Sequence, residues 1–240
     1  MELAKLEKAK EKFELACNEA EGISLMQNAG AAFKAVVVVK NLREVLTDEI
    51  MKEVFLPLMN TKIGFLTDRN GKPDKQGNKK SLYDITIVRD AIIDAASFGL
   101  LPTFNQMNII ADKMYPTKEG FTALLKKLKV KYILNFGADN TKQDAKFAEI
   151  SVKINYEFEG NKNSFLMTAV VPKNSYSSYD QLKGKAERRA KKMLYEYITG
   201  LDLGENDGET IQEPENRSIQ DAEIIDQKES TQKTINLENV

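Results

Sequence analysis

The stretch "KFAEISVKINYEF", residues 146–158, alternates strictly between apolar and polar positions. A repeat of two residues predicts a β-strand with one buried face. The segments "KYILNF" before it and "SFLMTAVV" after the turn "EGNKN" are further strand candidates. Because antiparallel strands need only short connections, we expect a small antiparallel meander. The apolar face of the strand at residues 146–158 would carry Ala148, Ile150, Val152, Ile154, Tyr156 and Phe158.

Elsewhere apolar residues recur every three or four positions, which is the spacing of one face of an α-helix. Thr47 is the expected N-cap of one such helix, and Gly99 is expected to end another. Met107–Met114 is a further strand candidate. The pattern predicts helices at residues 2–21, 25–39, 83–98 and 179–199, and two more that begin at Thr47 and Thr117.

These elements predict an α+β fold, with helices around the small antiparallel β-meander. We expect residues 1–40 to form N-terminal helices that either pack on the body or serve oligomerisation by packing on a neighbouring subunit. Residues 41–201 are expected to form the core domain. From Gly204 onward the chain is polar, acidic and free of aromatic residues. Such a composition cannot bury enough apolar surface to fold, so residues 202–240 are expected to be a disordered acidic tail.

The net charge of −1 hides a strong asymmetry between the tail and the rest of the chain. Asp202–Val240 contains 11 of the 36 acidic residues and 3 of the 35 basic residues, a net charge of −8. The preceding residues carry 25 acidic and 32 basic side chains, a net charge of +7. A basic body of this kind favours polyanionic partners. The acidic tail would compete for the same surface, recruit a partner, or simply be solvated.

The residue types that are absent exclude several kinds of chemistry. Histidine does not occur, and Cys17 is the one cysteine, which removes disulfides, Cys/His zinc sites and Ser–His–Asp triads. The glycine-rich phosphate-binding motifs are missing as well. Acidic residues are scattered rather than set at a nuclease or polymerase spacing. We therefore expect a protein without enzymatic activity or a required cofactor, although carboxylates leave Mg²⁺ binding open.

The longest apolar runs are too short to cross a bilayer, and the N-terminal "MELAKLEKAKEKFELA" is a charged helical segment rather than a signal peptide. Both features predict a cytoplasmic protein.

The last predicted helix carries the clearest candidate binding surface. Lys185, Arg188, Arg189 and Lys192 follow i, i+3, i+4, i+7 spacing and so share one face. Four cations in two turns repel one another unless they meet anions, and a phosphate backbone offers a regular row of anions. The alternative is an ordinary solvated helix face.

Two other regions contain candidate nucleic-acid contacts. The loop Thr67–Ser81 holds five basic residues, among them Lys79 and Lys80, and is either a phosphate contact or a solvated loop. Aromatic side chains also occur on both sides of this loop in the sequence, and single-strand binders stack bases on such rings. Packing in the core is the competing role for each of them. The aromatic residues concerned are Phe65, Phe98, Phe104, Tyr115 and Phe121.

The order of elements and several short motifs together resemble one known family. A helix ending in "DAIIDAASFGLLP" precedes a strand, and the helix "TKEGFTALLKKLKV" precedes the meander. A late helix with paired basic residues, "AERRAKK", closes the core. Over residues 41–199 this resembles the Redβ/RecT group of phage single-strand annealing proteins. The segment "FNQMNIIADKMYPT" replaces the more usual glycine-rich segment of that group, so the likeness is to a distant branch.

The resemblance implies an ATP-independent protein of bacteriophage recombination that coats single-stranded DNA and anneals complementary strands in the bacterial cytoplasm. It implies a homo-oligomer in the form of a ring or helical filament, with a 5′→3′ exonuclease and a host single-strand binding protein as partners. Asn105 and Asn108 would bind backbone, sugar or base edges, or else only their own backbone. The cations expected to reach phosphates are Lys118, Lys126, Lys127, Lys185, Arg188, Arg189 and Lys192.

Other functions remain compatible with the sequence. A single-stranded DNA or RNA-binding protein would bind in the same way without accelerating annealing. A magnesium-dependent nuclease would use acidic residues and cleave its substrate. A phage structural protein would oligomerise without binding DNA.

Overall fold

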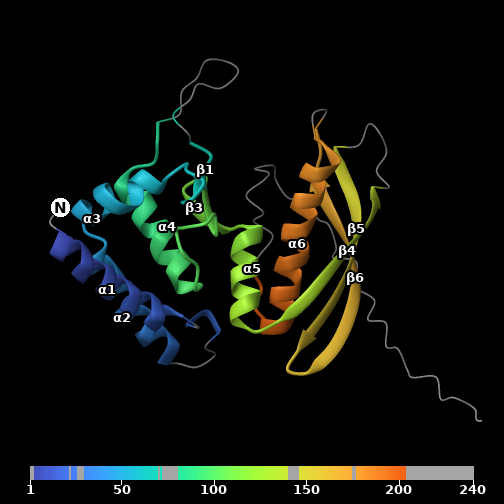
Figure 1. Ribbon diagram of the computed structural model, residues 1–240, viewed down its shortest axis with the longest axis horizontal. Coiled ribbons are helices and arrows are strands. Elements are labelled where there is room, and N and C mark those ends of the chain that lie inside the picture. Colours follow the sequence, from blue (N-terminus) through green and yellow to red (C-terminus); the bar gives the residue numbers. More distant parts are fainter. Residues whose placement is uncertain are drawn as a thin grey trace, which may run out of the picture.

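The computed structural model describes residues 3–21, 23–25, 30–69, 71, 81–139, 146–174 and 177–203. The fold is α+β, as the sequence predicts, with helices and two three-stranded sheets (Figure 1). Lys79, Lys80 and nearly all of the acidic tail lie outside the described residues.

The N-terminal part of the described chain is helical. Helix α1 (Leu3–Ala20) packs against α2 (Gly30–Val45), and both contact α4 (Ile85–Ser97). The second helix begins and ends later than the predicted residues 25–39, so the expected domain boundary after residue 40 lies inside it. A short α-turn, a π-helical turn and a 3-10 turn follow α2 and end at Leu58; they are α3 (Asp48–Ile50), η2 (Met51–Phe55) and η3 (Leu56–Leu58).

The predicted ends of these helices are confirmed by their capping contacts. Thr47 Oγ1 accepts a hydrogen bond from the backbone N–H of Ile50, which makes it the N-cap of α3. Gly99 follows α4 with φ of +79°, a left-handed conformation that glycine adopts without steric cost.

The first sheet has the order β1 (Leu66–Thr67), β2 (Met107–Ile110), β3 (Lys113–Pro116), with β1 parallel to β2 and β2 antiparallel to β3. The prediction of one strand over Met107–Met114 is therefore wrong. Ala111 and Asp112 both have positive φ, and this two-residue turn folds the segment into a hairpin.

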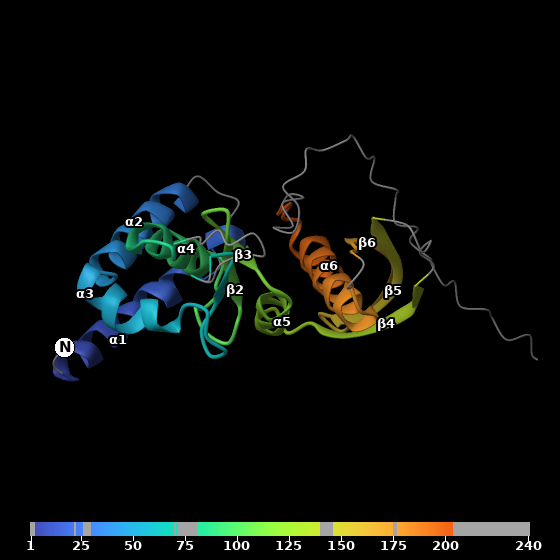
Figure 2. The same ribbon diagram turned by 90° about the horizontal axis from the view of Figure 1, so that it is seen from above.

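The second sheet is the predicted meander, in the order β4 (Lys131–Asp139), β5 (Phe147–Phe158), β6 (Asn161–Pro172), antiparallel throughout. The apolar positions of β5 from Ala148 to Tyr156 are buried, which confirms the reading of its alternation. Seen from above, the sheet curves around α6 (Tyr179–Thr199), so the helix covers one face and no described helix lies on the other (Figure 2).

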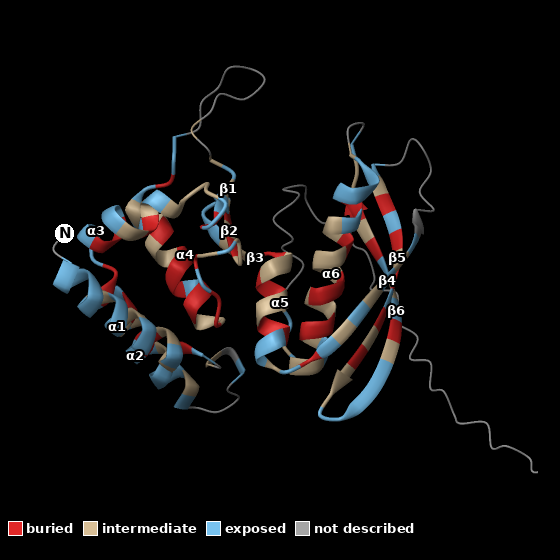
Figure 3. Ribbon diagram, in the orientation of Figure 1, coloured by how far each residue is buried: buried red, intermediate tan, exposed pale blue. Residues whose placement is uncertain are grey.

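Helix α5 (Lys118–Lys127) runs beside α6 and joins the two parts of the fold. Figure 3 shows buried residues along the sides of α5, α6 and β5 that face one another. The helical spacing of α6 puts Leu182, Ala186, Ala190, Leu194 and Tyr197 on one face; the first four are buried, but Tyr197 is 57% exposed. Its ring centre lies 5.5 Å from that of Phe165, a buried residue of β6.

Within the described part of the chain, the helices are too short or too polar to span a lipid bilayer.

Candidate nucleic-acid interface

The basic face of α6 lies against neighbouring elements and is half-buried. Arg188 Nε donates to the backbone oxygen of Pro116 at 3.1 Å, at the end of β3. Lys185 Nζ donates to Pro172 O at 3.3 Å, and Arg189 donates to Val170 O, both on β6. Lys192 Nζ lies 3.6 Å from Glu196 Oε1. Each of the four cations therefore has a partner within the protein, and holds the fold together whatever else it binds.

A chain of alternating charges connects α5 to α6. Lys118 Nζ lies 3.8 Å from a carboxylate oxygen of Glu119 and 3.8 Å from one of Glu187. Glu187 also pairs with Lys191, whose Nζ donates to Thr122 Oγ1 at 2.8 Å. We call these five residues the α5–α6 network. Sequence reasoning missed the buried Lys191, although its i+4 spacing from Glu187 is a recognisable signal for a helical ion pair.

Asn105 and Asn108 lie beside the start of α5 but do not bind their own backbone through their side-chain oxygens. Asn105 Nδ2 donates to Glu119 Oε2 at 3.4 Å, which attaches Asn105 to the α5–α6 network. The Oδ1 atoms of Asn105 and Asn108 are buried and accept no hydrogen bond from the described residues. Buried polar atoms are rarely left unpaired, so these two mark an unusual spot in the fold.

Exposed lysines gather where α5 ends and β4 begins. Lys127 lies 3.3 Å from Glu21, and Lys131 lies 3.0 Å from Glu157. Strand register places Lys131, Glu157 and Lys162 side by side on one face of the sheet. We call the following exposed residues the lysine corner: Lys126, Lys127, Lys129, Lys131 and Lys162.

The lysine corner combines predicted and unpredicted residues. Lys126 and Lys127 are sequence-predicted site residues, whereas Lys162 joins them only because β6 returns beside β5. Among the described residues, no carboxylate lies within ion-pair distance of Lys126, Lys129 or Lys162. Positive charge at this corner is therefore only partly neutralised within the protein.

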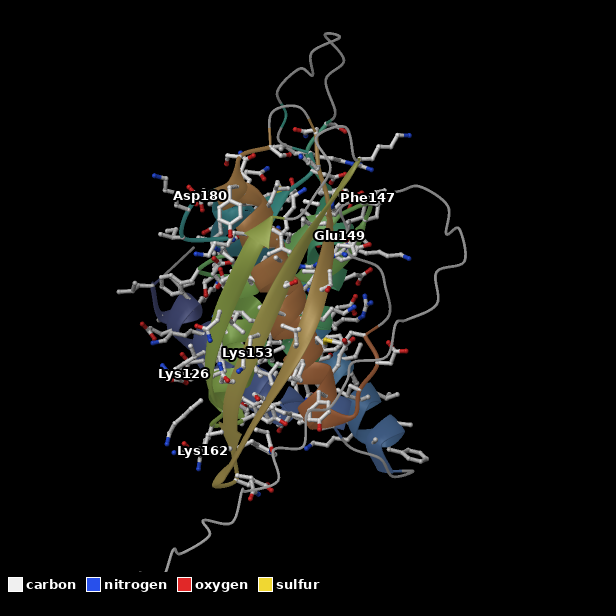
Figure 4. All side chains as sticks on the ribbon, turned by 90° about the vertical axis from the view of Figure 1, so that its right-hand side faces the viewer. Lys126, Phe147, Glu149, Lys153, Lys162 and Asp180 are labelled. Carbon is white, nitrogen blue, oxygen red and sulfur yellow. The ribbon has the colours of Figure 1, made fainter. Side chains whose placement is uncertain are left out.

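The lysine corner borders the sheet face that α6 does not cover. Figure 4 looks onto this face and shows Lys126, Lys153 and Lys162 on the same side of the molecule, with Glu149 further along β5. The face is mixed in character, because Ile133 and Leu166 on the neighbouring strands are 64% and 50% exposed. It offers cations, small polar groups and apolar side chains in adjacent rows.

A largely apolar cleft of about 510 Å³ adjoins the corner, between α1 and the chain that follows α4. Phe13, Leu100, Leu101 and Lys127 line it together with Cys17. Burial raises the pKa of the Cys17 thiol to about 11, in spite of the opposing effect of Lys127. The thiol is therefore protonated at neutral pH and is a poor nucleophile.

In the described ranges, the histidine-free set of Cys, Asp and Glu residues forms no cluster of three or more that could hold a metal ion. The described residues therefore offer no candidate Mg²⁺ site of this kind.

Comparisons with protein-family models, with curated proteins and with solved structures found no match for this chain.

Proposed function

We propose that this protein binds single-stranded DNA in the cytoplasm and anneals complementary strands without ATP, as in phage-type recombination. The lysine corner is the observation that carries the proposal. It combines five exposed lysines with an uncovered sheet face, on a body of net charge +7 before Asp202. Lysine is a flexible point charge, which suits contact with phosphates irrespective of base sequence.

Annealing makes physical demands that this surface can meet. Two strands pair faster when their phosphate repulsion is neutralised and their bases stay accessible. An open corner at the rim of a sheet can bind a backbone from one side and leave the bases outward. The reaction forms no covalent bond, so it needs neither a nucleophile nor a bound nucleotide.

A homo-oligomer would extend the corner into a continuous groove. Helix α2 supports this part of the proposal, because Phe33 is 79% exposed and Val36 and Val37 are 69% and 55% exposed. Apolar side chains gathered in this way on a helix surface mark an interaction site. The ring or filament form, the exonuclease and the single-strand binding protein follow only from the family resemblance.

The test mixes the protein with complementary labelled oligonucleotides in the absence of ATP and follows duplex formation. Faster pairing than in protein-free mixtures supports annealing. Binding of one strand without faster pairing would instead indicate a plain single-strand binder. Cleavage products that require Mg²⁺ would indicate a nuclease. No binding of DNA at all would favour a phage structural protein.

A further inference from the structure

The loop between α4 and β2 presents one aromatic ring to solvent. Of the five aromatic residues that the sequence places in this region, Phe65 and Phe121 are buried, and Phe98 and Tyr115 are half-buried. Phe104 alone among these five is exposed, at 70%, and Ile63 and Leu101 beside it in the fold are 61% and 42% exposed. Phe104 is therefore not a residue of the hydrophobic core.

The position of the Phe104 ring is set by a braced and strained backbone. The backbone N–H groups of Phe104 and Asn105 donate to Ile63 O and Gly64 O, each at 2.8 Å. Thr117, the N-cap of α5, donates its hydroxyl to Asn105 O. Phe104 and Asn105 have φ of 53° and 54°, left-handed values that a bulky residue such as phenylalanine seldom adopts.

Strain of this kind persists where surrounding contacts hold it in place, and it gathers at recognition sites. The loop thus holds a large apolar ring in water through a fixed network of hydrogen bonds, rather than letting it fold inward. The unpaired Oδ1 atom of Asn105 belongs to the residue that follows the ring, and that of Asn108 lies three residues further on. Both atoms are buried, so a bound strand does not reach them in this conformation.

The surroundings of Phe104 favour a nucleobase over a second protein surface. One projecting ring with two aliphatic neighbours offers far less than the roughly 800 Å² per partner that a stable protein interface buries. Exposed Lys62 adjoins Ile63 in the chain, and Leu101 and Lys127 line the same cleft, which links this loop to the lysine corner. Single-strand binders combine exposed aromatic rings with a basic surface, and the net charge of +7 before Asp202 supplies that surface here.

We propose that Phe104 stacks against a base of the bound single strand, at one end of a path that begins at the lysine corner. This inference rests on the proposed function and adds a base-contacting residue to it. The phosphate contacts would supply affinity without regard to sequence, and the ring would fix one base along the path.

The chain contains no tryptophan, so a Phe104→Trp variant carries a single fluorescent reporter of its own. We expect oligothymidine to quench this reporter on binding, and an abasic oligonucleotide of equal length to leave it unchanged. Tyr179→Trp, at the 45% exposed first position of α6, is the matched control and should not be quenched. Phe104→Ala should weaken oligothymidine binding about 10-fold, whereas Tyr179→Ala should not. Phe104→Leu keeps the apolar contacts and removes the ring, so it should weaken binding as well.

Wild-type binding separates the two proposals. If wild type binds oligothymidine while Phe104→Trp is not quenched and Phe104→Leu binds as tightly as wild type, stacking is overturned and the proposed function stands. Equal quenching of the Tyr179→Trp control would also overturn it. If wild type does not bind single-stranded DNA, both proposals fail together.

Discussion

Lys191 Nζ on α6 donates a hydrogen bond to Thr122 Oγ1 on α5 at 2.8 Å, and the same ammonium group pairs with Glu187. The lysine is 7% exposed, and its charge lies 5.9 Å from the ring centre of Tyr132 on β4. One side chain therefore connects two helices and the edge of the sheet.

Removing the Lys191 side chain should destabilise the fold. Lys191→Ala leaves Thr122 Oγ1 with only the longer hydrogen bond from the Tyr132 hydroxyl, at 3.5 Å, and Glu187 with only the more distant Lys118. The free energy of unfolding should therefore fall by about 2–3 kcal/mol. Lys183→Ala on the exposed side of the same helix is the control and should cost less than about 1 kcal/mol. Urea unfolding measures both; equal midpoints for the two variants would contradict a structural role for Lys191.

Two helical glycines should respond to alanine in opposite directions. A methyl group at Gly120 would overlap the backbone oxygen of Gln106, so Gly120→Ala should cost about 2–4 kcal/mol of stability. Gly184 on α6 has nothing within 4 Å of such a methyl group. Gly184→Ala should therefore stabilise the protein by about 0.5–1 kcal/mol through its better helix propensity. A stable Gly120→Ala variant in thermal unfolding would show that α5 does not lie so close to the loop.

Alkylation of Cys17 should be slow and should rise steeply with pH. The native thiol has a pKa of about 11, above the ordinary value, so native Cys17 holds its proton more tightly than in the unfolded chain. The thiolate fraction, and with it the rate of reaction with iodoacetamide, should grow about tenfold per pH unit up to that value. A rate that levels off near pH 8.5 in the folded protein would contradict this environment.

The same shift makes a prediction about stability. The native state binds the thiol proton more tightly than the unfolded chain does. The protonated thiol therefore adds to the free energy of unfolding at pH values below the pKa of Cys17 in the unfolded chain, and this stabilisation is lost as the pH rises toward about 11. Cys17→Ser should remove this part of the alkaline dependence.

The paired arginines of α6 should affect stability as well as binding. The sequence alone predicts that Arg188→Ala/Arg189→Ala weakens single-strand binding and flattens its salt dependence. The contacts with Pro116 O and Val170 O add a loss of about 1–2 kcal/mol per side chain. Thermal unfolding beside DNA titration separates the effects. Unchanged stability of the double variant would contradict the structural role of the two arginines. If its binding of single-stranded DNA were also weaker, both arginines would act only in DNA binding.

The fold was predictable where the pattern is local. Strand β5 follows from strict alternation and α6 from its helical periodicity, because both signals lie within the element itself. The hairpin of β2 and β3 could not be predicted, since its turn uses Ala111 and Asp112 rather than the Asn-Gly or Asp-Gly pairs that favour positive φ. Tyr197 keeps the helical period, but its ring contacts the sheet residue Phe165 and still remains 57% exposed.

The candidate site was predictable only in part, because it depends on long-range register. The family resemblance implied phosphate contacts for Lys126 and Lys127, but Lys162 joins them only through the pairing of β5 with β6. Spacing alone identified the basic face of α6, yet carbonyl oxygens of β3 and β6 face it in the fold. Phe104 could not be told from its buried aromatic neighbours until the loop geometry was known.

The rate of strand annealing in the absence of ATP tests the central claim most directly. Wild type should accelerate pairing of complementary oligonucleotides, and Lys126→Ala/Lys129→Ala/Lys162→Ala should lose most of that acceleration. The salt slope of single-strand binding by this variant should fall by about 2, at about 0.7 per lost phosphate contact. Lys5→Ala/Lys8→Ala/Lys12→Ala removes the same charge from exposed positions on α1 and should anneal like wild type. Equal annealing by both triple variants, or no acceleration by wild type, would contradict the account.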